Sequence, residues 1–194
     1  MTPALAKSIF VLALVIWGLV RYPYQHRAAK IPVQKSARNL AETSRIACAT
    51  FGLGIIPVFY AATGFPRFAD YRFVAELAYA GTLVFAFALW LFYLAHHQLG
   101  RNFSVSLDVR ENHVLVSKGV YAVIRHPMYL AFWLWAIGQF LLLPNWFAGL
   151  AGIFGFGVLY LGRIKQEEQL MLDTFGDDYR TYMNCTARVV PWIY

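Results

Sequence analysis

The chain has 194 residues, a length that favours a single domain, and 59% of them are hydrophobic whereas only 14% are charged. A soluble domain is nearer half hydrophobic and a quarter charged, so the composition argues for a membrane protein. The net charge of +7 does not indicate nucleic-acid binding, because the positive residues fall between apolar segments, where membrane topology and anionic lipid headgroups account for them.

Three apolar segments come first in the chain, at residues 4–20, 46–66 and 77–100. Each is long enough to cross a bilayer core of about 30 Å at about 1.5 Å per residue. A secretory signal peptide is the alternative for the first segment. The sequence RYPYQHR follows it, however, and not a small-residue cleavage site, so we predict a retained helix.

The fourth apolar block is too long for one span. Residues 126–162 contain no Asp, Glu, Lys or Arg, and as one helix they would measure about 55 Å. Pro144 and Asn145 interrupt the block, because proline removes a helix donor and the pair favours a turn. We therefore predict a hairpin of two short helices, residues 129–143 and 146–162, which need tilt or local bilayer thinning. The fold class is an all-α integral membrane protein with five transmembrane helices.

The distribution of Lys and Arg predicts the orientation of this multi-pass protein. Residues 21–45, residues 101–125 and the tail from 163 are rich in them, whereas the 64–75 loop has two and the 144–146 turn has none. Positive loops remain in the cytoplasm. The pattern therefore places the N-terminus outside and the C-terminus in the cytoplasm.

The two long cytoplasmic segments have patterns of their own. Hydrophobic residues alternate with polar ones at 105, 107 and 109, a turn is expected at 110–112, and Val114 and Val116 follow. This pattern predicts a small β-hairpin or an extended loop. The tail from 163 reads as a helix that leaves the membrane, breaks at Gly176 and continues as a second short helix.

Several chemical signatures are missing from the sequence. No Gly-rich phosphate loop, HExxH, CxxC or serine nucleophile elbow is present, and two cysteines form no disulfide framework. The adjacent pair His96 and His97 does not have the spacing of metal ligands on one helix face, so we expect no metal. The stretch GIFGFG lies inside an apolar helix and predicts close helix packing.

Ionisable and polar residues gather instead at the two open ends of the predicted hairpin. An antiparallel hairpin brings these ends together, so the sequence predicts that two sets face each other, namely Arg125, His126 and Tyr129 on one side and Arg163, Glu167 and Glu168 on the other. Singly, each has an ordinary explanation: Arg125 as a positive-inside residue, Pro127 as a first-turn proline, and Arg163 with Glu167 as a helix ion pair worth about 0.3–0.5 kcal/mol. Together they favour a polar pocket in the cytoplasmic leaflet, because unpaired ionisable groups at that depth are costly.

The stretches GVYAVIRHPMYL and RIKQEEQLMLDTFGDDYRTYMNCTARVVP resemble the isoprenylcysteine carboxyl methyltransferases and their prokaryotic relatives. The family pattern is G-x-Y-x-x-x-R-H-P-x-Y, a hydrophobic hairpin, R-x-x-x-E-E, F-G-x-x-Y and a basic-Val-Pro ending. The resemblance covers about the last 80 residues, and the first 100 match only as transmembrane helices. The chain is similar to a compact prokaryotic member.

This resemblance implies a single membrane-embedded methyltransferase domain, residues 1–194, with helices in 1–100 and the cofactor-binding loop, hairpin and tail in 101–194. The implied cofactor is S-adenosyl-L-methionine, with S-adenosyl-L-homocysteine as its product, in a cytoplasmic pocket built by the loop before helix 4 and the tail helices. Carried over to this sequence, the residues along the adenosine are Leu115, Val116 and Gly119. The residues at the border of the cofactor are Tyr121, His126 and Tyr129, and those at its polar end are Glu167 and Glu168.

The implied reaction is methylation of the α-carboxylate of a prenylated cysteine, whose lipid chain enters from the bilayer. That carboxylate is ionised at pH 7, since its reference pKa is about 3.3–3.7, and no general base is needed. Alignment and exclusion of water then carry the catalysis. Arg163 is our first choice to hold the carboxylate in a bidentate grip and Arg125 the second, while Glu167 fixes that arginine or the cofactor ammonium.

Other functions stay open at this point. The RHPxY…EE architecture also occurs in phospholipid N-methyltransferases and, more loosely, in sterol reductases. An amine acceptor must lose a proton and therefore needs a base near the cofactor. A non-enzymatic membrane scaffold or a transporter half is a further alternative, and the sequence names neither the natural acceptor nor the oligomeric state.

Overall fold

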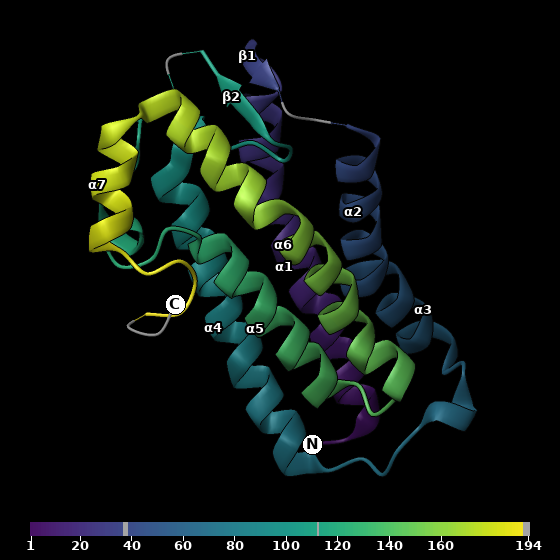
Figure 1. Cartoon of the computed structure of the whole chain (residues 1–194). Helices are drawn as coiled ribbons and strands as arrows, with labels where there is room; N and C mark the ends of the chain where they lie inside the picture. The colour runs from purple at the N-terminus through teal and green to yellow at the C-terminus, as the bar shows by residue number, and fades with distance from the viewer. Residues whose placement is uncertain (37–38, 112, 192–194) are drawn as a thin grey trace.

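The computed structural model describes residues 1–36, 39–111 and 113–191, and these residues form a bundle of long helices with a small two-stranded ribbon at one end (Figure 1). The ribbon, α7 and the C-terminal part of α6 lie at one end of the bundle, and the amino terminus lies at the other. The elements follow one another as α1 Pro3–Ala28, β1 Val33–Ser36, α2 Leu40–Thr50, a π-helical turn Phe51–Ile55, α3 Ile56–Thr63, α4 Ala75–Leu99, β2 Asp108–Arg110, α5 Pro127–Leu142, α6 Trp146–Phe175 and α7 Asp177–Cys185.

Capping side chains or first-turn prolines mark the starts of several helices. Thr2 caps α1 and Asn39 caps α2, where its side chain accepts a hydrogen bond from the backbone N–H of Glu42 at 2.8 Å. Pro3 and Pro127 occupy first-turn positions, where the missing N–H leaves no bond unmade. The helices therefore begin where local rules place them.

The predicted hairpin is present, but its second arm is longer than expected. The chain turns at Pro144, and Asn145 caps α6 by accepting from the N–H of Ala148 at 2.9 Å. The helix runs for 30 residues, because the predicted tail helix continues the second arm directly, and it ends at Gly176, whose φ of 56° suits glycine. The predicted break at Gly176 and the second short helix are confirmed as α7.

The protein is a mostly helical, multi-pass integral membrane protein. Within the described part of the chain, four helical segments are long and apolar enough to cross a membrane by length and composition: Pro3–Ala28, Leu40–Thr63, Ala75–Asn102 and Trp146–Phe175. Helix α5 is apolar but has only 16 residues, so five full spans stay a prediction. Large side chains on outward helix faces, such as Leu19 and Leu161, are 70% and 75% exposed, as contact with lipid requires.

The loop between α4 and α5 forms a strand whose partner was not expected. Strand β2 pairs antiparallel with β1, with Ser36 opposite Asp108, so the local hairpin with residues 114–116 is wrong. Residues 113–117 have no regular secondary structure, as the alternative of an extended loop predicted. Residue 112 of the expected turn lies outside the described residues. Leu107 and Val109 point inward and are each 1% exposed, so their burial against the bundle orients this strand.

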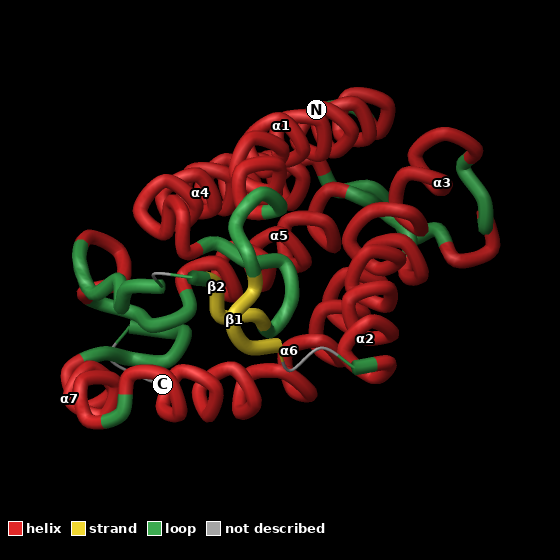
Figure 2. The backbone as a smooth tube through the Cα atoms, turned by 90° about the horizontal axis from the view of Figure 1, so that it is seen from above, coloured by secondary structure: helices red, strands yellow, loops and turns green. Residues whose placement is uncertain are grey.

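Helix α5 lies at the centre of the bundle, between α4 and α6 (Figure 2). On the other face of α6, Gly155 and Gly52 let the α2–α3 segment approach closely. A Cβ on Gly155 would lie 2.7 Å from the carbonyl oxygen of Cys48 and 3.1 Å from the Cα of Gly52. The close helix packing predicted from GIFGFG is therefore confirmed.

Candidate functional site

The segment before α5 is held in place by residues 186–191, which follow α7 and are called the C-terminal tail from here on. The backbone N–H groups of Arg125 and His126 donate to the carbonyls of Ala187 and Arg188 at 2.8 and 3.0 Å. Ala187 in turn donates to Val123 at 3.1 Å. These bonds form a short parallel bridge, so residues more than 60 positions apart in the chain fix the start of α5.

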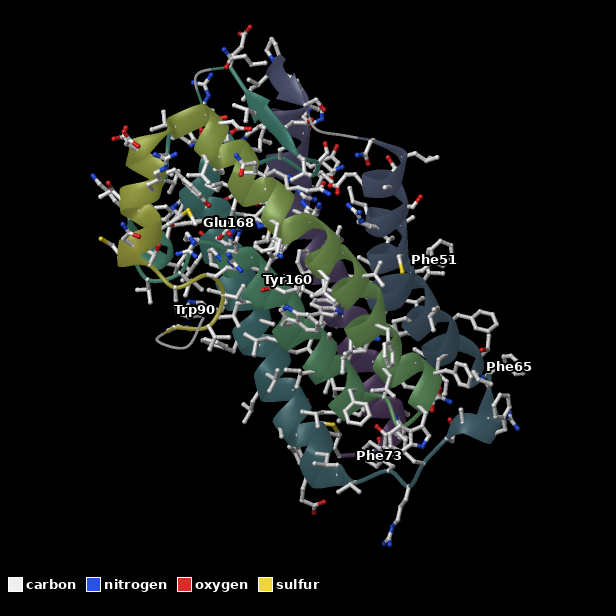
Figure 3. All side chains as sticks on the ribbon, in the orientation of Figure 1. Phe51, Phe65, Phe73, Trp90, Tyr160 and Glu168 are labelled. Carbon is white, nitrogen blue, oxygen red and sulfur yellow. The ribbon has the colours of Figure 1, made fainter. Side chains whose placement is uncertain are left out.

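Glu168 lies at the centre of a buried charge cluster. Its Oε1 is 3.1 Å from the Nε of Arg125, and its two oxygens accept from Nε and Nη2 of Arg188 at 3.1 and 2.7 Å. Arg125 also donates through Nη1 to the carbonyls of Met183, at 2.9 Å, and Thr186. Figure 3 shows Glu168 among nitrogen atoms near α7, whereas the opposite part of the bundle is mostly carbon.

Glu167 joins the same cluster from the neighbouring position on α6. Its Oε2 accepts from the hydroxyl of Tyr129 and from the Nε of Arg163 at 3.2 Å, and its Oε1 lies 3.6 Å from the Nδ1 of His126. The other ring nitrogen of His126 is 3.5 Å from Glu168. The convergence predicted from the hairpin topology is confirmed at the level of individual atoms.

Arg163 connects this cluster to the N-terminal half of the chain. Its Nη1 lies 3.0 Å from Oε1 of Glu42 on α2 and donates to the carbonyl of Val105 at 2.9 Å. Glu42 is completely buried, and the sequence analysis did not identify it. A signal for it existed, because Glu42 is the only acidic residue before Asp70 and lies three residues after the helix cap Asn39.

One cavity of about 890 Å³ connects this polar cluster with an apolar interior. Its apolar branch runs between α1, the α2–α3 segment, α5 and α6, and is lined by groups such as Leu53, Val58 and Trp135. Ile55 and Phe59 also line it and are 48% and 53% exposed, so the branch reaches the outer surface of the helices.

Most of the residues selected from the sequence line this cavity. They are Leu115, Val116, Tyr121, Arg125, His126, Tyr129, Arg163 and Glu167. Gly119 and Glu168 do not line it. Gly119 has a φ of 63° and packs against the side chain of Gln98, which accepts from the N–H of Val120 at 2.8 Å, so this glycine shapes the loop.

Tyr182 on α7 is held as a neutral hydrogen-bond donor. Burial raises the pKa of Tyr182 to about 12, although Arg125 acts in the opposite direction. Its hydroxyl donates to the carbonyl of Tyr121 at 2.7 Å. Helix α7 therefore helps to fix the position of Tyr121, which lines the cavity.

The pKa of His126 is set by burial and by two neighbouring carboxylates. Burial alone would lower its pKa, but the carboxylates of Glu167 and Glu168 beside its two ring nitrogens outweigh burial and raise the pKa above the ordinary value of about 6.5. The charged imidazolium is therefore favoured by the fold.

The raised pKa of His126 predicts how stability depends on pH. The contribution of the imidazolium is fully present below the unfolded-state pKa of about 6.5 and is lost as pH rises through the higher folded-state pKa. Unfolding of the wild type and of His126→Gln in detergent should therefore differ most near pH 6 and converge at alkaline pH. A difference that stays constant or grows with pH would contradict this assignment.

The fold and site define a multi-pass membrane protein in which an ionisable pocket joins an apolar channel inside the bundle. Residues 79–173 match the model of the isoprenylcysteine carboxyl methyltransferase (ICMT) family. The chain belongs to the isoprenylcysteine carboxyl methyltransferase family. Membership implies that a methyl donor is used.

Relatives and a solved structure agree with this assignment. The chain is 28% identical over 191 residues to the protein-S-isoprenylcysteine O-methyltransferase of Saccharomyces cerevisiae, covering 96% of this chain and 80% of that protein. The human protein of the same name is 30% identical over 122 residues, which cover 62% of this chain but 43% of the human protein. The structure of a eukaryotic intramembrane Ras methyltransferase ICMT aligns with a TM-score of 0.60 and 26% identity, covering 100% of this chain and 69% of that one.

Proposed function

We propose that this protein transfers a methyl group to the α-carboxylate of a prenylated cysteine and forms a methyl ester, with S-adenosyl-L-methionine as the donor. The observation that supports this proposal most directly is that one cavity joins a cluster of arginines and carboxylates to an apolar branch reaching the lipid-facing surface. A prenylated cysteine has the same division into an ionised end and a long apolar chain. The names of the relatives support the same acceptor.

The polar end of the cavity fits the methyl donor by its chemistry. Leu115, Val116 and Tyr121 offer apolar and aromatic surface for an adenosine, and the carboxylate of Glu167 lies in the wall where an ammonium group can pair with it. When bound, the donor supplies an electrophilic methyl group on a sulfonium. His126 and Tyr129 hold Glu167 in position and complete this wall.

Besides binding its substrates, the site must align the reacting groups and exclude water. Arg163 and Glu167 are the proposed catalytic residues, with Arg163 presenting a fixed positive charge to the acceptor carboxylate and Glu167 fixing the guanidinium through the 3.2 Å contact. Phe132, Phe156 and Leu159 line the cavity beside them and exclude water, which strengthens these electrostatic interactions. The acceptor is already ionised, so the proposed chemistry requires no base.

The same cavity supports treating residues 1–194 as one domain, since both halves of the chain supply its walls. It also supports a substrate that enters sideways from the bilayer, because the branch passes exposed Ile55 and Phe59. With the N-terminus outside, the charge cluster and the tail lie on the cytoplasmic side, in agreement with the positive-inside rule.

Transfer of a labelled methyl group from S-adenosyl-L-methionine to N-acetyl-farnesylcysteine tests the proposal. We expect a label that mild base releases, as it does from a methyl ester. The matched control acceptor is the amide of the same compound, which keeps the prenyl chain but lacks the carboxylate and should take up no label. Absence of base-labile label, or equal labelling of the amide, would overturn the proposed function.

A further inference from the structure

Arg21 is a cation that lines the cavity and has no acidic partner in the described part of the chain. It lies near the C-terminal end of α1, is half-buried and lines the cavity. Its guanidinium carbon lies 5.1 Å from the ring centroid of Trp17 and 5.4 Å from that of Phe103, and both rings also line the cavity. Among the residues that the structure describes, no carboxylate forms an ion pair with Arg21.

The other arginines at this end of the cavity are already engaged. Arg125 and Arg188 share Glu168, and Arg163 contacts Glu167 through Nε and Glu42 through Nη1. A bidentate grip needs two neighbouring N–H groups, so Arg163 would have to release one of these contacts to provide it. Arg21 can provide a bidentate grip without breaking any ion pair.

An uncompensated guanidinium in this place is costly unless an anion joins it. Ionisable residues inside a membrane protein are rare and mark functional sites, and here the charge of Arg163 adds repulsion to the desolvation of Arg21. A positive-inside residue that only marks the membrane boundary would extend its head toward water. Arg21 instead lies over two aromatic rings of the cavity wall.

The surface of α1 around Arg21 matches the shape of an amphipathic acceptor. Leu14, Trp17, Gly18 and Arg21 all line the cavity, and their spacing of three, four and seven residues places them on one helix face. Two turns of apolar surface therefore lead directly to the guanidinium. A ligand with a long apolar chain and a terminal carboxylate can lie along this face with its charge at Arg21.

We propose that Arg21 binds the α-carboxylate of the methyl acceptor, so that α1 supplies the recognition of the charged end. This inference rests on the proposed function for the identity of the acceptor. It assigns to a residue outside the matched region 79–173 the grip that the sequence analysis gave to Arg163. Arg163 then acts from the opposite wall of the same cavity.

The test compares Arg21→Met with Arg21→Lys and with Arg27→Met, which removes an exposed arginine from the same helix. For Arg21→Met we expect the KM for N-acetyl-farnesylcysteine to rise roughly 10- to 100-fold, because a charge-assisted hydrogen bond is lost. Arg21→Lys should fall between Arg21→Met and the wild type, and Arg27→Met should match the wild type. Binding of S-adenosyl-L-homocysteine, followed by calorimetry, should stay unchanged in all three and thereby report a folded site.

A second measurement separates charge recognition from loss of shape. N-acetyl-farnesylcysteine and its amide are compared as ligands by calorimetry, and the wild type should prefer the acid. Arg21→Met should lose that preference while retaining its affinity for the amide. An unchanged KM, or an equal loss of affinity for acid and amide, would overturn the role of Arg21. If the wild type binds the acid but transfers no methyl group, the proposed function fails while this comparison still tests Arg21.

Discussion

Replacing Glu168 with alanine should lower the free energy of unfolding by about 3–5 kcal/mol, because the change leaves buried positive charges without their partner. Glu168 is 4% exposed and pairs with Arg125 and Arg188 at distances between 2.7 and 3.1 Å. Those arginines connect the start of α5 to the tail. The loss should therefore release the tail as well as destabilise the bundle, and limited proteolysis of residues 186–191 should accelerate.

The matched control for this prediction is Asp177→Ala. Asp177 also pairs with an arginine, Arg180, at 3.0 Å, but the two side chains are 91% and 73% exposed. Water screens such a surface pair, so its removal should cost less than about 1 kcal/mol. Unfolding by denaturant in detergent, followed by circular dichroism, measures both variants. Equal losses for Glu168→Ala and Asp177→Ala would refute the central role of Glu168.

The second large effect is expected for Arg163→Lys, which keeps the charge and removes the planar fork. The guanidinium of Arg163 reaches Glu167, Glu42 and the carbonyl of Val105 in three directions, and a single ammonium cannot hold all three at these distances. We expect kcat to fall by about 100-fold, since misplacement of a positioning group by about 1 Å costs that much. Binding of S-adenosyl-L-homocysteine should change far less.

Arg180→Lys is the corresponding control, because it makes the same exchange at an exposed ion pair on α7. Its methylation rate should equal that of the wild type. Steady-state rates with N-acetyl-farnesylcysteine for both variants decide the matter. If Arg163→Lys retains the wild-type rate, Arg163 has no part in orienting the reacting groups.

Local patterns in the sequence predicted the helices well. Hydropathy and the break at Pro144 and Asn145 placed the apolar segments and the hairpin, because burial in lipid depends on a run of neighbouring residues. The tail from 163 was predicted as helical, but its continuity with the second arm of the hairpin as one helix α6 was not predicted, and the pairing of β2 with β1 was missed. The strand pairing depends on a contact between segments far apart in the chain, and no local pattern reports that.

The candidate site was predicted in part. The convergence of His126, Tyr129 and Glu167 followed from topology alone, since the two open ends of an antiparallel hairpin must meet. Glu42 was missed because it comes from a helix far away in the chain, and Arg188 because its position in the site depends on how the tail returns to the start of α5.

The sequence by itself determined that this protein is a helical membrane protein, where its chain turns, and that acids and bases meet at one end of a hairpin. The tertiary structure decided which of those charges are paired. Glu168 holds two arginines, Arg163 is occupied by Glu42 and Glu167, and Arg21 has no such partner among the described residues. The physical reason is that hydropathy adds up along neighbouring residues, whereas an ion pair depends on distances of a few ångströms between segments that only folding brings together.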